Sequence, residues 1–186
     1  IIHDLNPSTI PDIKNVFARE KLVLVHGGGK EVTDTAFKLG KEQNFVISPG
    51  GVKSRYTDRE TAEIYTMVMA GKINKVIVKM FLEQGIKAVG ISGIDGGLMR
   101  ASRKKRLLIL NDKGRKMAIE GGFTGKISGV DPLLLNIIAN NGFLPIVSPV
   151  AFSDEFDFLN VDGDRAAANI AAGIGANKVI FLTNVE

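Results

Sequence analysis

The chain has 186 residues, of which 45% are hydrophobic and 24% charged, a composition that is ordinary for a globular protein with a sizeable core. It has no cysteine and two histidines, which excludes disulfides, thiolate chemistry and the usual structural zinc sites. No apolar run approaches the roughly 20 residues of a membrane span, and residues 1–20 lack the basic and apolar regions of a signal peptide. We therefore expect a cytoplasmic protein without a membrane partner.

The net charge of +4 conceals a local excess of basic residues. Residues 100–116, RASRKKRLLILNDKGRK, contain eight basic residues and one acidic residue, whereas the rest of the chain is slightly acidic. A charge that is concentrated in this way predicts one basic surface rather than a generally cationic protein.

Helices and strands are predicted to alternate along the chain. Helical spacing and capping residues predict helices over 10–20, 30–40, 58–85, 131–142 and 162–176. Apolar runs predict strands over 21–25, 87–92, 143–149 and 178–183. Asp58 is the expected N-cap of the longest helix, Gly85 its end, and Gly71 a point where it divides. This alternation predicts an α/β fold with a mainly parallel sheet that is covered by helices on both faces.

A β-hairpin interrupts this alternation. Two strand-like segments, 106–110 and 115–120, flank the turn sequence Asn-Asp-Lys-Gly at 111–114. We expect this hairpin to be an insertion at one edge of the sheet.

Unusual residues follow four of the predicted strands: HGGG at 26–29, SGIDGG at 92–97, SPV at 148–150 and TN at 183–184. Ligands of open parallel sheets bind beyond the carboxyl ends of the strands, so these segments are the candidate site.

The HGGG segment permits two interpretations. Glycine lacks Cβ and leaves backbone N–H groups free to face an anion at a helix N-terminus, which favours an oxyanion or phosphate cradle. A sharp strand-to-helix turn is the alternative. The segment is neither a Walker A loop nor a G-x-G-x-x-G fingerprint, and an esterase would require a G-x-S-x-G elbow that the sequence lacks.

Two further groups of polar residues are candidates. Asn160, Asp162 and Asp164 alternate before a helix, a pattern that fits either a cation loop or a helix cap, although the glutamate of an EF-hand is missing. Arg55, in the glycine-containing loop 49–61, could hold a substrate carboxylate through a bidentate contact, or it could be a solvated surface arginine.

Taken together, the motifs LVLVHGGG, SRYTD, AVGISGIDGGL, LPIVSPVA and NVDGDRAAANIAAGIGA resemble, in order and spacing, the amino-acid kinase family and its acetylglutamate kinase group. SRYTD, RKKR at 103–106 and EGGFTGK at 120–126 are most similar to the archaeal kinases that phosphorylate aminoadipate or glutamate attached to the small acidic carrier protein LysW. The resemblance covers nearly the whole chain.

This resemblance implies a three-layer αβα sandwich, with an acceptor-binding lobe over residues 1–175 and the start of a nucleotide-binding lobe over 176–186. It implies ATP and Mg²⁺ as cofactors, no metal ligand from the protein, and transfer of a phosphoryl group to a side-chain carboxylate. Such a carboxylate is already ionised near pH 7, so positioning and charge neutralisation suffice and no general base is needed.

The resemblance also implies roles for single residues. Gly27 and Gly28 would be catalytic and substrate-binding, because they would lie against the substrate and the transferring phosphoryl group. Arg55 would hold the substrate's α-carboxylate, Asn160 would bind substrate, and Asp164 would organise the catalytic lysines. The basic residues Arg103, Lys104, Lys105 and Arg106 would bind the acidic carrier.

Two features depart from the family's pattern. The family's Lys-x-Gly-Gly strand has no counterpart before Ile1, and its second catalytic lysine and adenine site lie beyond Glu186. We therefore expect the sequence to be a piece of a longer kinase that is poorly active or inactive alone. The apolar residues of 58–85 predict a homodimer contact, with a purely internal core as the alternative.

The same sequence features also fit other functions. The nearest rival is an acetylglutamate kinase that acts on a free small substrate and needs no basic hairpin. A non-catalytic amino-acid-binding module is another. Nucleic-acid binding is disfavoured, because the basic hairpin lacks aromatic residues for base stacking and the sequence shows no recognition motif.

Overall fold

A parallel sheet of three strands forms the centre of the computed structural model, which describes residues 9–111 and 113–182. In this sheet β9 (Leu144–Ser148) lies between β1 (Leu24–Val25) and β4 (Ala88–Ser92), in the order β1-β9-β4. The register pairs Val25 with Val147 and Ser92 with Ser148, so the carboxyl ends of the three strands lie side by side.

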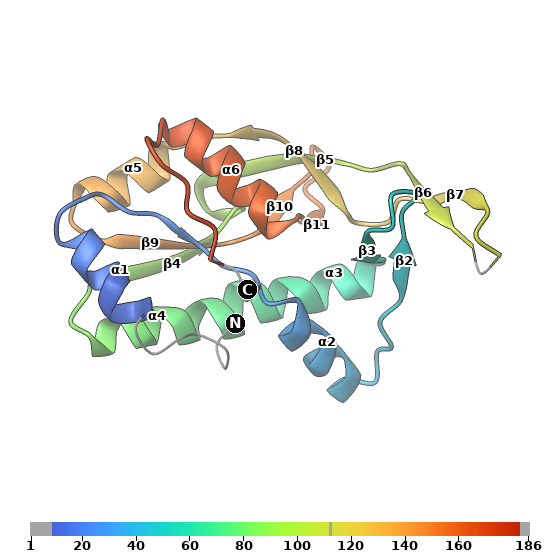
Figure 1. The fold of residues 1–186 in the computed structure, drawn as a ribbon, viewed down its shortest axis with the longest axis horizontal. Coiled ribbons are helices and arrows are strands. Elements are labelled where there is room, and N and C mark those ends of the chain that lie inside the picture. Colours follow the sequence, from blue (N-terminus) through green and yellow to red (C-terminus); the bar gives the residue numbers. More distant parts are fainter. Residues whose placement is uncertain (1–8, 112, 183–186) are drawn as a thin grey trace.

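Helices cover both faces of this sheet (Figure 1). All five residues of β9 are buried, as expected for a strand that is covered on both sides. Leu144 and Ile146 pack in one hydrophobic cluster with Phe81 of α4 (Asn74–Glu83). Val147 packs in a second cluster with Ile170 of α6 (Gly163–Ile174). The predicted α/β fold is thus confirmed around this sheet.

The helix predicted over 58–85 is one continuous helical run with an unusual centre. It comprises α3 (Arg59–Thr66), the π-helix η1 (Met67–Ile73) and α4. Asp58 caps its start by accepting a hydrogen bond from the Thr61 N–H at 2.8 Å, as predicted, and Gly85 ends it with φ of 76°. Gly71 lies inside the π-helix and does not divide the run, contrary to the prediction.

The remaining predicted helices are present with shifted ends. They are α1 (Thr9–Phe17), α2 (Gly29–Lys38), α5 (Leu133–Asn140) and α6. In the part of the chain that the structure describes, no helix combines the length and apolar character that crossing a membrane requires.

Several strands were not predicted, so the expected mainly parallel arrangement holds for the central sheet but not for the others. A mixed sheet has the order β11-β10-β5-β8, and β2 pairs with β3 in a separate antiparallel pair. These strands are β2 (Phe45–Ile47), β3 (Lys53–Arg55), β5 (Met99–Arg103), β8 (Gly125–Val130), β10 (Val150–Phe152) and β11 (Phe158–Asn160). Most are only three residues long or contain charged residues, so the sequence carries a weak strand signal there.

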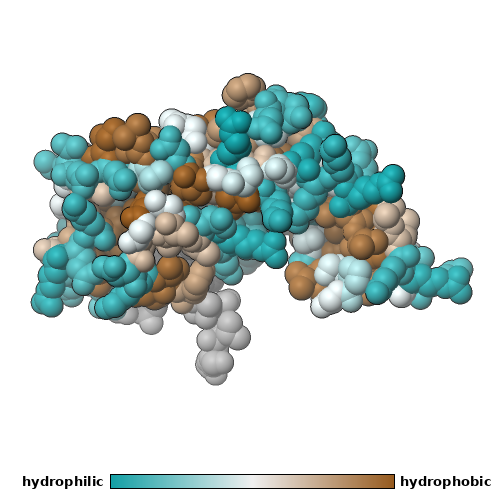
Figure 2. Space-filling view, turned by 90° about the horizontal axis from the view of Figure 1, so that it is seen from above, coloured by the Kyte–Doolittle hydropathy of each residue, from teal (hydrophilic) through white to brown (hydrophobic). Residues whose placement is uncertain are grey.

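The predicted hairpin is confirmed. Its strands β6 (Arg106–Leu110) and β7 (Lys116–Glu120) pair antiparallel from Arg106 opposite Glu120 to Leu110 opposite Lys116, and they extend from one end of the molecule (Figure 1). Hydrophilic residues cover the outer end of this extension (Figure 2). Leu108 and Met117 are exposed hydrophobic residues on the hairpin.

The strand predicted over 178–183 is not found in the residues described, 178–182. A strand requires a neighbouring strand for its backbone hydrogen bonds, and none of the described strands pairs with this segment. The apolar side chains Ile180 and Leu182 that indicated a buried strand are 75% and 69% exposed. The predicted strand end at 183–184 lies outside the described residues.

Candidate active site

The strand ends and one helix start meet at the carboxyl edge of the central sheet. β1 continues into His26, β9 into Pro149 and β4 into Gly93. Gly163, the first residue of α6, lies beside His26: a methyl group added to its α-carbon would lie 3.9 Å from the His26 carbonyl oxygen. The structure therefore brings together the two predicted constellations, the glycines at 27–29 and the acidic run at 162–164.

The glycine loop leads directly into α2, whose first residue is Gly29. The first N–H groups of an α-helix have no partner within the helix, and the positive end of the helix dipole lies there. Gly28 has a second reason to lack a side chain, which the sequence did not reveal. A Cβ atom at this position would overlap the Cδ1 atom of Ile73 and lie 3.0 Å from the sulfur of Met69, both in the π-helix η1.

Arg55 lies at the end of β3 against the outer side of the glycine loop. Its Nη2 donates to the Gly29 carbonyl oxygen at 2.7 Å and to the Thr33 hydroxyl at 3.0 Å, and its Nη1 donates to the Gln43 side chain. Burial lowers the pKa of Arg55, although a guanidinium remains charged at neutral pH. The predicted arginine is therefore a positive charge fixed next to the helix N-terminus.

Tyr65, a residue of α3 that sequence reasoning missed, connects the elements beneath the site. Its buried hydroxyl lies 3.1 Å from the Pro149 carbonyl oxygen and 3.3 Å from that of Val161, so it holds the end of β9 and the approach to α6 together. Burial raises the pKa of Tyr65, which keeps the hydroxyl protonated as a donor. A tyrosine within the predicted helix was the available signal.

Asn160 is held at the end of β11 by two hydrogen bonds. Its side-chain Nδ2 donates to the hydroxyl of the fully buried Thr57 at 3.1 Å, and its backbone N–H donates to the Phe123 carbonyl oxygen at 2.9 Å. The backbone carbonyl oxygen of Thr57 accepts from the Phe123 N–H at 2.6 Å. The loop after Arg55 and the strand before α6 are therefore joined through this asparagine.

The two aspartates that follow occupy different positions. Asp162 is the N-cap of α6 and accepts from the Arg165 N–H at 3.0 Å, so the helix-cap interpretation is confirmed for this residue. Asp164 is exposed in the first turn of α6, at the same edge of the sheet as the glycine loop. Asp162 is therefore used by the fold, whereas Asp164 takes no part in the cap.

The second glycine-rich strand end is a closed turn. Asp95 accepts from the Ser92 N–H at 2.6 Å and from the Ser92 hydroxyl at 2.8 Å. Gly96 and Gly97 adopt φ values of 62° and 72°, which other residues rarely adopt. The glycines of this segment thus have a conformational role.

A cavity of about 500 Å³ lies at the base of the basic hairpin. It is lined by Ala101, Ser102, Arg103, Lys104, Lys105, Glu120, Ser153, Asp154, Glu155 and Asp157. The Arg103 guanidinium is engaged within the chain: it donates to the Gly122 carbonyl oxygen at 2.6 Å and to Glu120 at 3.1 Å, and lies 4.1 Å from the centre of the Phe123 ring. Lys105 and Arg106 are exposed.

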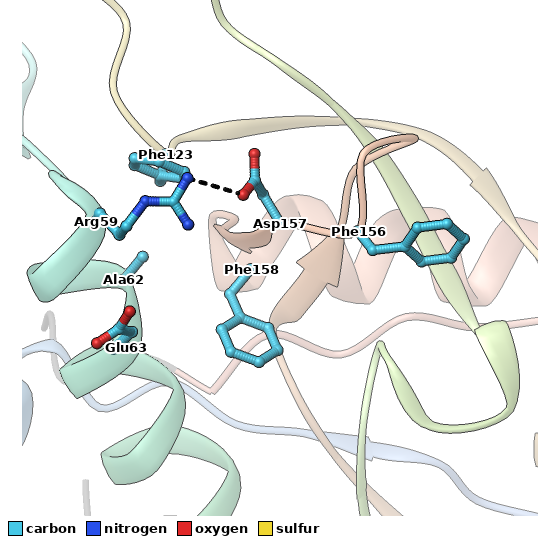
Figure 3. A pocket seen from close by; sticks show the side chains of 7 residues that line it. All are labelled: Arg59, Ala62, Glu63, Phe123, Phe156, Asp157 and Phe158. Atoms are coloured by element: carbon cyan, nitrogen blue, oxygen red, sulfur yellow. Dashed lines mark hydrogen bonds and ion pairs between the residues drawn. The ribbon is translucent and has the colours of Figure 1, made fainter.

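A second cavity, of about 100 Å³, lies between α3 and the segment before β11 (Figure 3). Arg59 and Asp157 form an ion pair of 3.3 Å there, and the Arg59 guanidinium lies 4.8 Å from the centre of the Phe123 ring. Phe156 points away from this ion pair in Figure 3. Sequence reasoning had singled out none of these residues as functional.

Comparison with known proteins agrees with this architecture. The model of the amino acid kinase family matches residues 7–186. A Nitrosopumilus maritimus protein, provisionally named a LysW-aminoadipate/LysW-glutamate kinase, is 56% identical over all 186 residues, which span 70% of its own length. The Saccharolobus solfataricus LysW-aminoadipate/LysW-glutamate kinase is 44% identical over 178 residues, 95% of this chain and 66% of that protein.

The fold is also similar to that of solved structures. A Streptococcus mutans protein has a TM-score of 0.81 at 20% identity, and the alignment covers the whole of this chain and 69% of the other. Because the family model covers nearly the entire chain and the Nitrosopumilus maritimus protein is 56% identical over all of it, the chain belongs to the amino acid kinase family.

Proposed function

We propose that this kinase transfers the γ-phosphoryl group of ATP to the side-chain carboxylate of aminoadipate or glutamate carried by an acidic LysW-like protein, in lysine or arginine biosynthesis. Use of ATP follows from membership of the amino acid kinase family. The structural observation that supports the acceptor role is the contact of Arg55 with Gly29, which sets a fixed positive charge beside the start of α2.

The acceptor carboxylate attacks the γ-phosphorus, the bond to the β-phosphate oxygen breaks, and ADP and an acyl phosphate result. A carboxylate with a pKa of about 4 is already ionised at neutral pH, so the protein need not remove a proton. Its task is to bring two anions together and to stabilise the charge of the transferring group. Backbone N–H groups of Gly27 and Gly28, with the N-terminus of α2, would supply part of that stabilisation.

The other site residues would orient the substrate. Arg55 would hold its α-carboxylate, which remains free when the amino group is attached to a carrier. Asn160, fixed by its bond to Thr57, would contact the substrate from the side of β11. Asp164 would position the catalytic lysines through its exposed carboxylate at the start of α6.

Mg²⁺ would enter this site with ATP rather than through protein ligands. Among the described residues there is no group of three histidine, aspartate or glutamate side chains that could hold a metal ion. Mg²⁺ commonly keeps several waters and binds to substrate phosphates, so the proposal requires no such group. Bound in this way, Mg²⁺ would neutralise phosphate charge.

The basic side chains at the base of the hairpin would receive the carrier. Lys104 and Lys105 line the cavity of about 500 Å³, and Arg106 is exposed beside them. A free amino acid would not need all three of these cations, whereas an acidic protein that contacted them would associate faster and in a defined orientation. The cavity itself is of mixed charge, since four carboxylates also line it. The three cations favour a carrier-bound substrate over a free acetylated glutamate, and over a module without catalysis.

We further infer that residues 1–175 form the acceptor lobe of a three-layer αβα sandwich, that 176–186 begin the nucleotide lobe, and that the reaction takes place in the cytoplasm.

A homodimer that pairs through 58–85 is also part of the proposal. Many apolar residues of this run pack in the chain's own core, which leaves Met67 and Leu82, 58% and 53% exposed, for a partner. Light scattering at micromolar concentration tests this proposal, and a molar mass equal to that of one chain would refute the homodimer.

The carrier proposal is tested with the kinase expressed from its complete reading frame. The triple variant Lys104→Glu, Lys105→Glu, Arg106→Glu reverses the basic surface but keeps Arg103, which the fold uses. We expect kcat/KM for carrier-bound substrate to fall about 10-fold or more, with little change for acetylglutamate. The control reverses Lys113, Arg115 and Lys116 at the outer end of the hairpin. Equal loss on both acceptors, or no loss on either, would refute a carrier site here.

A further inference from the structure

We propose that Asn74 is a positioning residue of this kinase, which acts through His26 to fix the peptide group between Gly27 and Gly28. The inference rests on the proposed function only in that the glycine loop is the place where phosphoryl transfer occurs. The two side chains come from elements that are far apart in sequence, the first residue of α4 and the end of β1.

Asn74 is completely buried, and its contacts determine how its amide is oriented. Its Nδ2 lies 2.9 Å from the Ile146 carbonyl oxygen of β9 and 3.3 Å from the Ile91 carbonyl oxygen of β4. Its Oδ1 lies 3.1 Å from the Lys75 ammonium. The opposite orientation would set an amide oxygen against two carbonyl oxygens and an amide nitrogen against a cation, so the orientation follows from chemistry.

This orientation fixes the tautomer of His26. The Asn74 Nδ2 shares its two hydrogens among three neighbours, the two carbonyl oxygens and the His26 Nε2 at 3.3 Å. A hydrogen on Nε2 would face a nitrogen that cannot accept it, so the geometry favours an Nε2 without a hydrogen. The remaining ring nitrogen, Nδ1, then carries the proton, and it lies 3.0 Å from the Gly27 carbonyl oxygen. His26 therefore donates to the glycine loop. Burial lowers the pKa of His26, which favours the neutral ring that this arrangement needs.

Fixing the Gly27 carbonyl has a consequence for the other side of the same peptide. In a trans peptide the C=O and the following N–H point in opposite directions within one plane. Once His26 holds the Gly27 oxygen, the Gly28 N–H points away from His26 and cannot rotate independently. A glycine loop is otherwise free to reorient, so an external bond is needed to keep this donor aligned.

A purely structural role for Asn74 is the alternative, because its bonds to Ile91 and Ile146 also join α4 to the sheet. Gly90 of β4 accommodates it, since a Cβ atom at position 90 would overlap the Asn74 side chain. The two roles differ in what happens at His26, so the test must include a measurement on that ring.

The first measurement is the ¹⁵N NMR spectrum of the imidazole ring of His26 in the kinase expressed from its complete reading frame. We expect the wild-type ring to carry its proton on Nδ1, and the ring in Asn74→Ala to become a mixture of tautomers. A wild-type ring protonated on Nε2 would overturn the proposal without any variant, even if Asn74→Ala failed to fold. An unchanged Nδ1–H tautomer in Asn74→Ala would overturn it as well.

The second measurement is a double-mutant cycle on kcat. In His26→Asn the amide nitrogen occupies approximately the place of Nδ1 and can donate to Gly27 without help from Asn74. We expect Asn74→Ala to lower kcat about 10-fold in the His26 background and less than about 3-fold in the His26→Asn background, with KM nearly constant. Equal losses in the two backgrounds would indicate a structural role and contradict the proposal.

Each assay is run with carrier-bound substrate and with acetylglutamate. If the kinase phosphorylates acetylglutamate alone, the carrier proposal fails, while the cycle on kcat still decides the role of Asn74. If the kinase phosphorylates neither acceptor, the proposed function fails, and the tautomer measurement alone decides whether Asn74 controls His26.

Discussion

Gly28 lies so close to the buried side chain of Ile73 that a methyl group at position 28 would overlap the Ile73 Cδ1 atom. We predict that Gly28→Ala lowers the free energy of unfolding by about 1–3 kcal/mol, the usual cost of overpacking a core. Ile73→Val removes the overlapping methyl and should restore part of that loss. Chemical denaturation of the two single variants and the double variant measures the coupling.

Gly71 provides the matched control for this prediction. A methyl group there would meet nothing within 4 Å, although Gly71 lies in the same π-helix as Ile73. Gly71→Ala should therefore leave stability unchanged or raise it by up to about 1 kcal/mol, because alanine favours helix. Equal destabilisation by both alanines would show that contact with Ile73 is not the reason for Gly28.

Asp58 is predicted to stabilise α3 through its cap. Asp58→Ala removes the acceptor of the Thr61 N–H and should lower the free energy of unfolding by about 1 kcal/mol. Asp58→Asn should retain most of the stabilisation that the cap provides, because asparagine also caps helices. Burial opposes ionisation of Asp58, but hydrogen bonds from Lys41 and Thr61 outweigh it and lower its pKa below 3.8. Stability from the ionised form is therefore present above that pH and lost as the pH falls through the lowered pKa. Thermal unfolding between pH 7 and 3 measures this.

The buried neutral ring of His26 is predicted to make the fold sensitive to acid. Because its folded pKa lies below 6.5, the unfolded chain takes up a proton first as the pH falls. The free energy of unfolding should then decrease below about pH 6.5, by at most about 1.4 kcal/mol per pH unit, until the folded pKa is reached. His26→Asn lacks this group and should show a flatter profile. Parallel profiles for both proteins would mean that His26 titrates normally.

Arg55→Ala is predicted to raise the KM for the acceptor about 10-fold or more, with a smaller effect on kcat, because the variant loses a charged contact to the substrate. Arg55→Lys keeps the charge but loses the bidentate guanidinium contact, so its KM should lie between those of the wild type and Arg55→Ala. Steady-state kinetics on the kinase expressed from its complete reading frame measures both. A reduced kcat with unchanged KM would show that Arg55 acts by holding Gly29 rather than the substrate.

Asp164→Asn is predicted to lower kcat while leaving the melting temperature unchanged, since Asp164 is exposed and not the cap of α6. Asp162→Ala is the comparison: it removes the cap and should cost about 1 kcal/mol of stability. Kinetics and thermal melting of the two variants separate the roles. Wild-type kcat in Asp164→Asn would exclude Asp164 from catalysis.

Elements with strong local signals were predictable from sequence. The buried strand 143–149, the capped start at Asp58 and the hairpin with its Asn-Asp-Lys-Gly turn are each encoded within a few residues. β3 and β5, by contrast, contain charged residues and become strands only because a partner lies beside them. The prediction for the apolar segment at 178–182 failed in the opposite way, because a strand was expected there and is not found. Hydrophobicity indicates burial but does not supply a neighbouring strand.

The site was predictable to a similar extent. The strand-end rule located the glycine loop and the segments after β4 and β9 at one edge, because parallel strands end together. The acidic run was found by its alternating spacing before a helix, and no rule placed it beside the glycine loop. The contacts of Gly28 with Ile73 and of Tyr65 with Val161 join residues that are distant in sequence, and no local pattern specifies them. The engagement of Arg103 with Gly122 and Phe123 was hidden for the same reason, since a run of basic residues looks uniform in sequence.

The π-helix at Met67–Ile73 sets the angular phase between the two halves of the long helix. Each residue turns an α-helix by 100°, so one extra residue in a wide turn rotates everything after it by about that amount. In a regular α-helix Tyr65 and Asn74, nine residues apart, would lie about 180° from each other, and the π-helix reduces this angle to about 80°. Tyr65, which bonds Val161, and Asn74, which contacts His26, are therefore both buried. A segment of the same length that wound as a regular α-helix would therefore turn Asn74 away from the glycine loop.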